Sequence, residues 1–351
     1  MENITNFFKD KGKGLLLCFA IAFPIWLLTR LIKPLEVVGA PILAILAGMV
    51  ISLIIKDKTS FKNGIAFSSK KILQWAVVLL GFGLNLGTVG QVGLTSLPII
   101  LSTITTSLVM AWILNKALKV PYKTATLIGI GSSICGGSAI AASAPVVNAN
   151  EEEVAQSISV IFLFNVIAAF IFPTLGNLIG LSDMGFGLFA GTAINDTSSV
   201  TAAASTWDTL HNTGGMVLGY ATIVKLTRTL AIIPIILVLS FVELKREKIK
   251  TDFSLKKIFP IFIIYFVVAS LITTISTSLL TGVFLDFANS VFVFLKQLSK
   301  FMIVMAMASI GLNTNIVKLV KNSGKPLLLG LGCWISIAVV SLILQKALGL
   351  G

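Results

Sequence analysis

Two apolar stretches of the chain contain unusually many small and hydroxyl-bearing residues. The first, 124–147, includes the run GIGSSICGGSAIAASAP. Two adjacent glycines disfavour a continuous helix by ~1 kcal/mol each. A helix break frees backbone N–H groups, and the half-helix that follows points its positive end at the gap, where an anion can bind. Close helix packing through small residues is the alternative explanation. The predicted anion ligands of this stretch are Ser132, Ser133, Gly136, Gly137 and Ser138.

The second stretch, 186–205, has a dense polar run, INDTSSVT, in otherwise apolar sequence. Asp196 is its acidic residue, and ionisable groups inside a membrane are expensive and usually functional. Asp196 could carry a proton or help to hold a cation. The alternative is that Asp196 lies in a loop exposed to water. We predict Asn195, Thr197 and Ser198 as further anion ligands.

Two cations, Lys225 and Arg228, lie near the middle of the apolar stretch 215–242. Three residues apart, they share one helix face and need an anionic partner. Asp196 is one candidate and a bound anionic substrate is another. This excess of positive charge at depth is the main physical reason to expect an anion as the substrate. The alternative is a structural ion pair with Asp196 and a lysine that reaches toward the membrane surface.

The composition defines the setting of these residues. Hydrophobic residues make up 56% of the chain and charged residues 12%, against roughly 25% in a soluble domain. The apolar runs are long and do not alternate, which favours membrane-spanning helices over barrel strands. We therefore expect an all-α polytopic membrane protein, with residues 1–351 forming a single transmembrane domain in two halves, about 1–180 and 181–351.

About eleven membrane segments are predicted. Two of them, 124–147 and 186–205, are expected to be discontinuous or re-entrant. The nine ordinary spans are 15–32, 39–55, 72–90, 97–115, 154–176, 215–242, 258–280, 294–312 and 326–345.

The basic residues set the orientation. They cluster at 9–13, before the first span, and at 56–71, 116–123, 245–257 and 318–325, in alternate connections between the nine ordinary spans. Lys and Arg accumulate in cytoplasmic loops, so the N-terminus is expected in the cytoplasm and the C-terminus outside the cell membrane. The net charge of +13 is explained in the same way rather than by nucleic acid binding, because there is no soluble basic domain.

Internal matches predict inverted repeats. At an offset of 228 residues, Gly83-Leu84-Asn85 matches Gly311-Leu312-Asn313, in spans of opposite direction. At an offset of 60, the two unusual segments also match each other. One linear repeat cannot contain both offsets, so either the units are circularly permuted or one match is accidental. Asn85 and Asn313 would line the path or cap helix ends.

No enzyme constellation is found in the sequence. The chain has a single histidine and three scattered cysteines, and it lacks a P-loop and a nucleophile–base pair. We expect neither catalysis, nor a cofactor, nor a metal site.

Several motifs resemble those of the bacterial YeiH-type family, known as sulfate exporters. They are GIGSSICGGSAIAASAP (Gly129–Pro145), GTAINDTSSVTAAAS (Gly191–Ser205), LGFGLNL around Asn85 and ASIGLNT around Asn313. The resemblance covers nearly the whole chain. It implies an exporter of the plasma membrane, similar to the bile-acid-symporter-like anion transporters, with inverted five-helix repeats and discontinuous helices. That scheme pairs spans two to six with seven to eleven, whereas the 228-residue match pairs span three with span ten.

The combined expectation is an alternating-access exporter of a small anion such as sulfate, a sulfonate or a carboxylate. Lys225 and Arg228 would attract the anion, the serines, Asn195 and Thr197 would bind it, and Asp196 would couple its movement to H+ or Na+. The lipid bilayer is the expected surrounding and a homodimer the default assembly. The alternatives are a non-transporting scaffold or sensor, and an anion channel.

Overall fold

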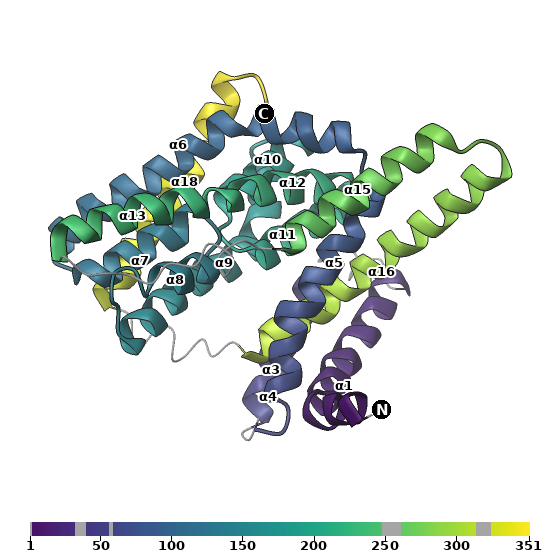
Figure 1. Cartoon of the computed structure of the whole chain (residues 1–351), viewed down its shortest axis with the longest axis horizontal. Helices are drawn as coiled ribbons and strands as arrows, with labels where there is room; N and C mark the ends of the chain where they lie inside the picture. The colour runs from purple at the N-terminus through teal and green to yellow at the C-terminus, as the bar shows by residue number, and fades with distance from the viewer. Residues whose placement is uncertain (1, 32–39, 56–58, 248–260, 314–323) are drawn as a thin grey trace. The chain divides into compact units, whose positions relative to one another are not determined.

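The computed structural model describes residues 2–31, 40–55, 59–247, 261–313 and 324–351 (Figure 1), and all of its regular structure there is helical. Parts of the predicted basic connections, 56–58, 248–260 and 314–323, lie outside the described residues. The helices are α1 (Glu2–Leu31), α3 (Ala40–Ile54), α4 (Lys62–Phe67), the π-helix η1 (Ser68–Ile72), α5 (Leu73–Leu80), the 3-10 helix η2 (Gly81–Gly83), α6 (Leu86–Leu118), α7 (Tyr122–Ser133), α8 (Gly137–Ser143), α9 (Glu151–Leu178), α10 (Asp183–Ala193), α11 (Thr197–His211), α12 (Met216–Leu230), α13 (Ile232–Glu247), α15 (Phe262–Leu279), α16 (Val283–Asn313) and α18 (Gly324–Ala347).

Eight helical stretches of the described chain are long and apolar enough to cross a membrane. Helix α3 is apolar but only 15 residues long. Many large apolar side chains are exposed on these helices, such as Leu53 and Leu178, as expected for surfaces that contact lipid. The eight stretches are Lys9–Leu31, Lys62–Gly83, Leu86–Leu118, Glu152–Leu178, Met216–Glu243, Phe262–Leu279, Val283–Asn313 and Gly324–Ala347.

The chain divides into two compact units that alternate along the sequence. Unit 1 takes the described residues of Met1–Gln91, Thr201–Gly219 and Ile261–Asn315. Unit 2 takes those of Val92–Val200, Tyr220–Pro260 and Ile316–Gly351. Each unit therefore draws residues from both halves of the sequence.

Unit 1 is held together by close helix packing through glycine. A Cβ atom added to Gly48 of α3 would lie 2.4 Å from the carbonyl oxygen of Ala308 in α16, and one at Gly14 would lie 2.3 Å from that of Phe61. Small residues that allow backbones to touch are typical of helix contacts in membranes. In Figure 1, α15 and α16 of this unit form a long hairpin.

Unit 2 is built around α9, which contacts α7, α8, α10 and α18. An aromatic cluster joins three of these helices. Phe172 of α9 stacks on Phe189 of α10, with ring centroids 4.5 Å apart, and on Trp334 of α18 at 5.5 Å. These contacts fix α9 and α10 side by side.

Both unusual segments are discontinuous. The first consists of α7 and α8, separated at Ile134, Cys135 and Gly136, where Gly136 has φ +69°. The second consists of α10 and α11, separated at residues 194–196. The Nζ of Lys123, at the start of α7, donates to the carbonyl oxygen of Asn148, beyond the end of α8, at 2.7 Å. The first segment therefore turns back to the end of unit 2 from which it entered.

Candidate functional site

The two helix breaks meet at the middle of α9. The side-chain oxygen of Asn165 accepts a hydrogen bond from the backbone N–H of Asn195, in the second break, at 3.0 Å. A Cβ at Gly136, in the first break, would lie 3.5 Å from Nδ2 of the same asparagine. Helix α7 begins near the N-terminal end of α9, and α10 begins shortly after its C-terminal end. The two half-helices thus approach from opposite ends and stop at one crossing.

Lys225 of α12 connects the two breaks. Its ammonium group is fully buried and donates to the carbonyl oxygen of Ile134 at 2.7 Å and to that of Ile194 at 3.1 Å. These carbonyls lie at the C-terminal ends of α7 and α10. An ammonium group has three N–H donors, so one donor of Lys225 remains beyond these two bonds.

Arg228, one helical turn further along α12, is also fully buried, and every nitrogen of its guanidinium group donates hydrogen bonds. Nε donates to Ser133 O at 2.8 Å. Nη1 donates to Thr192 O at 2.7 Å and Ile194 O at 3.3 Å. Nη2 donates to Ser132 O at 2.5 Å and to Asn195 Oδ1 at 3.3 Å. These five bonds match the five N–H donors of a guanidinium group, which leaves none for another partner.

These contacts explain why two cations occur at this depth. The last carbonyls of a helix have no partners within it, and the C-terminal end carries a partial negative charge. Two such ends meet here in an apolar interior. The sequence predicted that Lys225 and Arg228 would face Asp196 or a bound anion. In the described part of the chain, all of their hydrogen bonds go to carbonyl or amide oxygens of the two breaks.

Two polar groups at the crossing have no hydrogen-bond partner among the described residues. They are the hydroxyl of Ser132, in the last turn of α7, and Nδ2 of Asn195. Both side chains are fully buried. Each residue accepts from Nη2 of Arg228 with a different atom, Ser132 with its carbonyl oxygen and Asn195 with Oδ1. Leaving a buried polar group unbonded costs about 1–3 kcal/mol. These two groups, with the remaining N–H of Lys225, are suited to hold a small polar ligand.

Asp196 lies at the start of α11 and is half-buried. Its Oδ2 accepts from the backbone N–H of Ser198 at 3.0 Å and from the Ser198 hydroxyl. The carboxylate thus caps α11 at its positive end. Thr197, half-buried, is the first residue of this helix.

The remaining predicted ligands are placed less favourably. The Ser133 hydroxyl donates to Ile130 O within α7 at 2.9 Å. Ser138 is exposed on α8. Gly136 and Gly137 stand at the break itself, and only Gly136 has a positive φ. The crossing therefore gathers Ser132, Asn195, Asp196, Lys225 and Arg228, and it leaves Ser138 at the surface.

Comparison with known proteins places the chain in a family. A family model described as Conserved hypothetical protein 698 matches residues 13–330. A UPF0324 membrane protein of Fusobacterium nucleatum is 58% identical over 97% of this chain and 99% of its own length. The chain belongs to the UPF0324 family. This family is the YeiH-type group, so the resemblance in the motifs is confirmed.

Other UPF0324 membrane proteins are similar to the same extent. That of Streptococcus agalactiae is 58% identical over 97% of this chain and 99% of its own length. That of Streptococcus mutans is 59% identical over 97% of this chain and 98% of its own length. Together with the eight apolar helices, these matches show that this UPF0324 chain is a multi-pass helical membrane protein.

Sequence reasoning missed one central residue of this UPF0324 protein. Asn165 is buried at the crossing and receives the N–H of the second break. Its signal was an amide side chain in the middle of the apolar stretch 154–176. Ser341 of α18 was also missed. Its hydroxyl lies 2.7 Å from that of Thr192, at the end of α10.

Two polar residues of unit 1 serve as helix caps. Asn85 Oδ1 accepts from the backbone N–H of Gly87 at 2.8 Å, at the start of α6, so this asparagine caps a helix end. Asp208 is buried in α11 and accepts from the N–H groups of Val217 and Leu218, both at 3.0 Å, in the first turn of α12. Both contacts satisfy N–H groups that a helix leaves free at its start.

Proposed function

We propose that this UPF0324 protein is a secondary-active transporter of a small anion, and that the crossing of the two broken segments is its substrate site. The observation that carries the proposal is the pair of fully buried, unpartnered polar groups, Ser132 Oγ and Asn195 Nδ2, beside two buried cations. A hydroxyl and an amide that can both donate, next to positive charge, suit an oxyanion. Sulfate, a sulfonate and a carboxylate share this chemistry.

The charge at the crossing supports an anion over a neutral solute. The half-helices meet there as two C-terminal and two N-terminal ends, whose partial charges oppose each other. Lys225 and Arg228 then contribute two positive charges and Asp196 one negative charge. A net positive charge in an apolar interior is costly unless it is paired. A monovalent anion, or a divalent one that brings a proton or Na+, would balance it.

Transport is supported by the architecture of unit 2. Irregular backbone at membrane depth is tolerated where it is buried in protein or lines a cavity, and broken helices that meet near the midplane are typical of secondary transporters. We propose eleven membrane segments, made of the eight long helical stretches, α3 and the two broken segments. The approach of α7 and α10 from opposite ends of α9 supports inverted repeats within one transporter domain.

The direction and the coupling are the finer parts of the proposal. The distribution of basic residues supports a cytoplasmic N-terminus and a C-terminus outside. Resemblance to the YeiH-type family supports export across the cell membrane. Asp196, at the start of α11, would bind H+ or Na+ and so link the second half-helix to an ion gradient.

Thermal unfolding of the detergent-purified protein tests the site. The panel contains sulfate, sulfite, methanesulfonate and acetate. An anion that binds only the folded state stabilises it by ~2.7 kcal/mol at a hundredfold excess over the dissociation constant. Ser132→Ala removes an unpartnered hydroxyl, so we expect equal or higher stability without anion and a weaker response to the anion. Loss of one hydrogen bond to a charged group, about 1.5–3 kcal/mol, lowers affinity about tenfold or more.

Ser133→Ala is the matched control, because the Ser133 hydroxyl is already bonded to Ile130 O. It should keep the response of the parent protein. If no anion stabilises the parent, or if both variants respond like it, the crossing is not an anion site. Saturable counterflow of the stabilising anion in proteoliposomes then tests transport. Conductance without counterflow would indicate a channel. The absence of both conductance and counterflow would indicate a scaffold or sensor.

A further inference from the structure

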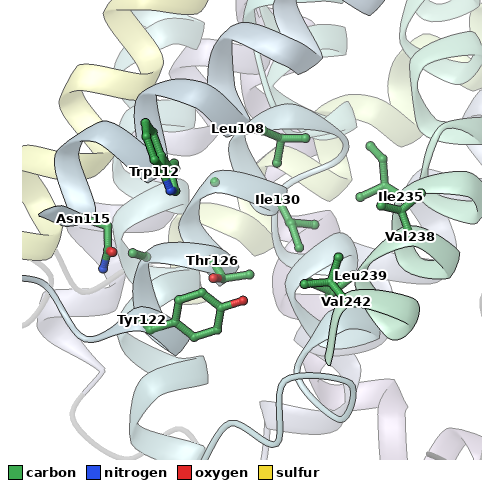
Figure 2. Close-up of a pocket in the computed structure, with 13 residues that line it drawn as sticks. Leu108, Trp112, Asn115, Tyr122, Thr126, Ile130, Ile235, Val238, Leu239 and Val242 are labelled. Atoms are coloured by element: carbon green, nitrogen blue, oxygen red, sulfur yellow. The ribbon is translucent and has the colours of Figure 1, made fainter. Parts of the chain in front are cut away.

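A groove of about 200 Å³ runs between α6, α7 and α13 of unit 2 (Figure 2). It is smaller than the roughly 300–1,000 Å³ of pockets for drug-sized ligands. Trp112 of α6 and Val238 of α13 line it and are more than half exposed, so the groove opens at the surface. Ile130 and Ala125 of α7 are buried and form its floor.

The walls of the groove are almost wholly apolar. Leu108 of α6 and the side chains of Ile235, Val238, Leu239 and Val242 of α13 face it. Helices α6 and α13 belong to stretches long and apolar enough to cross a membrane. A groove of this kind on such helices faces lipid chains rather than water, and filling it restores the packing that a void forfeits.

Two polar side chains mark one end of the groove. The hydroxyl of Tyr122, at the start of α7, points toward α13 and donates to Glu243 Oε1 at 2.6 Å. Asn115 Nδ2 donates to Val120 O at 2.7 Å, just after the end of α6. Helices α6 and α13 end here and α7 begins. This end therefore corresponds to the membrane surface.

Positive charge surrounds the same end. The Nζ of Lys116 lies 3.8 Å from the ring centroid of Trp112, which lines the groove. Lys119 and Lys123 lie within the next two turns of chain. The one described acidic side chain at this end of α13, Glu243, accepts from the Tyr122 hydroxyl, so the basic residues are in excess. Trp and Lys together are typical of helix ends at the level of lipid headgroups.

We propose that this groove binds one anionic phospholipid of the surrounding leaflet. An acyl chain would fill the apolar groove between α6 and α13, and the phosphate headgroup would lie at Lys116. Neutral lipids could offer the same chain, so the positive charge at the end of the groove decides the preference. Because α7 forms the floor of the groove, the bound acyl chain would pack against α7 and stabilise its position. The last carbonyls of α7 are those to which Arg228 donates.

Native mass spectrometry of the full chain tests the proposal. Detergent-purified protein is incubated with equal amounts of a phosphatidylglycerol and a phosphatidylcholine that have identical chains. We expect one bound phosphatidylglycerol to be retained in preference. Lys116→Gln should lower that preference about fivefold, because one basic residue near an anionic surface contributes about 1 kcal/mol to binding. Lys346→Gln, an exposed lysine on α18, is the matched control and should leave it unchanged.

Filling the groove gives an independent test. Thr126→Phe places a ring in the groove and should abolish retention of both lipids, whereas Val109→Phe, on the exposed surface of α6 outside it, should not. Val238→Trp fills the groove from the opposite wall if Thr126→Phe does not fold. Equal retention of the two lipids by the parent, or full retention by a folded groove-filling variant, would overturn the proposal. These readouts do not depend on anion transport.

Discussion

Asn165 Oδ1 accepts a hydrogen bond from the backbone N–H of Asn195 at 3.0 Å, across 30 residues of chain. This contact joins the middle of an unbroken helix, α9, to the point at which α10 stops. A broken helix leaves N–H groups without partners in its own backbone. A single buried amide on a neighbouring helix thus bonds one N–H of the second break and helps to fix its position.

Replacement of Asn165 by leucine tests this role. Asn165→Leu removes the acceptor and leaves the N–H of Asn195 buried without a partner, which should lower the free energy of unfolding by about 1–3 kcal/mol. Thermal unfolding in detergent measures the change. Asn177→Leu is the matched control, because this asparagine is exposed near the end of the same helix. Equal unfolding temperatures for the two variants would contradict the assignment.

Arg228 is predicted to be the main stabilising cation of the crossing. Arg228→Met removes the arginine donors of the carbonyl oxygens of Ser132, Ser133 and Thr192, and each buried acceptor left unbonded costs about 1–3 kcal/mol. Arg228→Lys keeps the charge but not the five-donor fork, so we expect an intermediate loss. The yield of monodisperse protein and the unfolding temperature report both effects. An Arg228→Met protein as stable as the parent would show that the hydrogen bonds of Arg228 are not needed for stability.

The two neighbouring glycines should respond oppositely to alanine. Gly136 has φ +69° and ψ −128°, a conformation that a side chain strains by about 1–3 kcal/mol. Gly137 is helical, and a Cβ there would lie 3.9 Å from its nearest neighbour. Gly136→Ala should therefore destabilise the protein, whereas Gly137→Ala should be neutral or stabilise it by up to about 1 kcal/mol. Thermal unfolding of both variants checks the contrast, and a reversed order would show that Gly136 does not need its backbone freedom.

Asp196→Asn separates coupling from folding. Asparagine caps a helix as well as aspartate does, so the start of α11 should remain intact and stability should change little. We expect the variant to keep anion-dependent stabilisation but to lose its response to a proton or sodium gradient, since the amide cannot be protonated or carry charge. Uptake by proteoliposomes with and without each gradient measures this. Gradient-driven transport by the variant would exclude Asp196 as the coupling group.

The sequence by itself determined the class of protein and the location of its special segments. Long apolar runs and few charges predict membrane helices because lipid cannot hydrogen-bond to backbone or charged groups. The glycine pair at 136–137 and the polar run around Asp196 predicted both discontinuities for a local reason, since each weakens a helix where it stands. The family resemblance depended on the same residues.

Only the tertiary structure decided how the charges are used. Lys225 and Arg228 were visible as cations needing partners, but Ser132 O lies 96 residues from Arg228 along the chain and Ile134 O lies 91 residues from Lys225. Every residue carries a carbonyl, so sequence cannot indicate which carbonyls a helix break will leave free. The role of Asn165 was hidden for the same reason, because its partner is a backbone N–H brought near only by packing. Local composition thus predicts where helices break, whereas the fold determines which groups meet at the breaks.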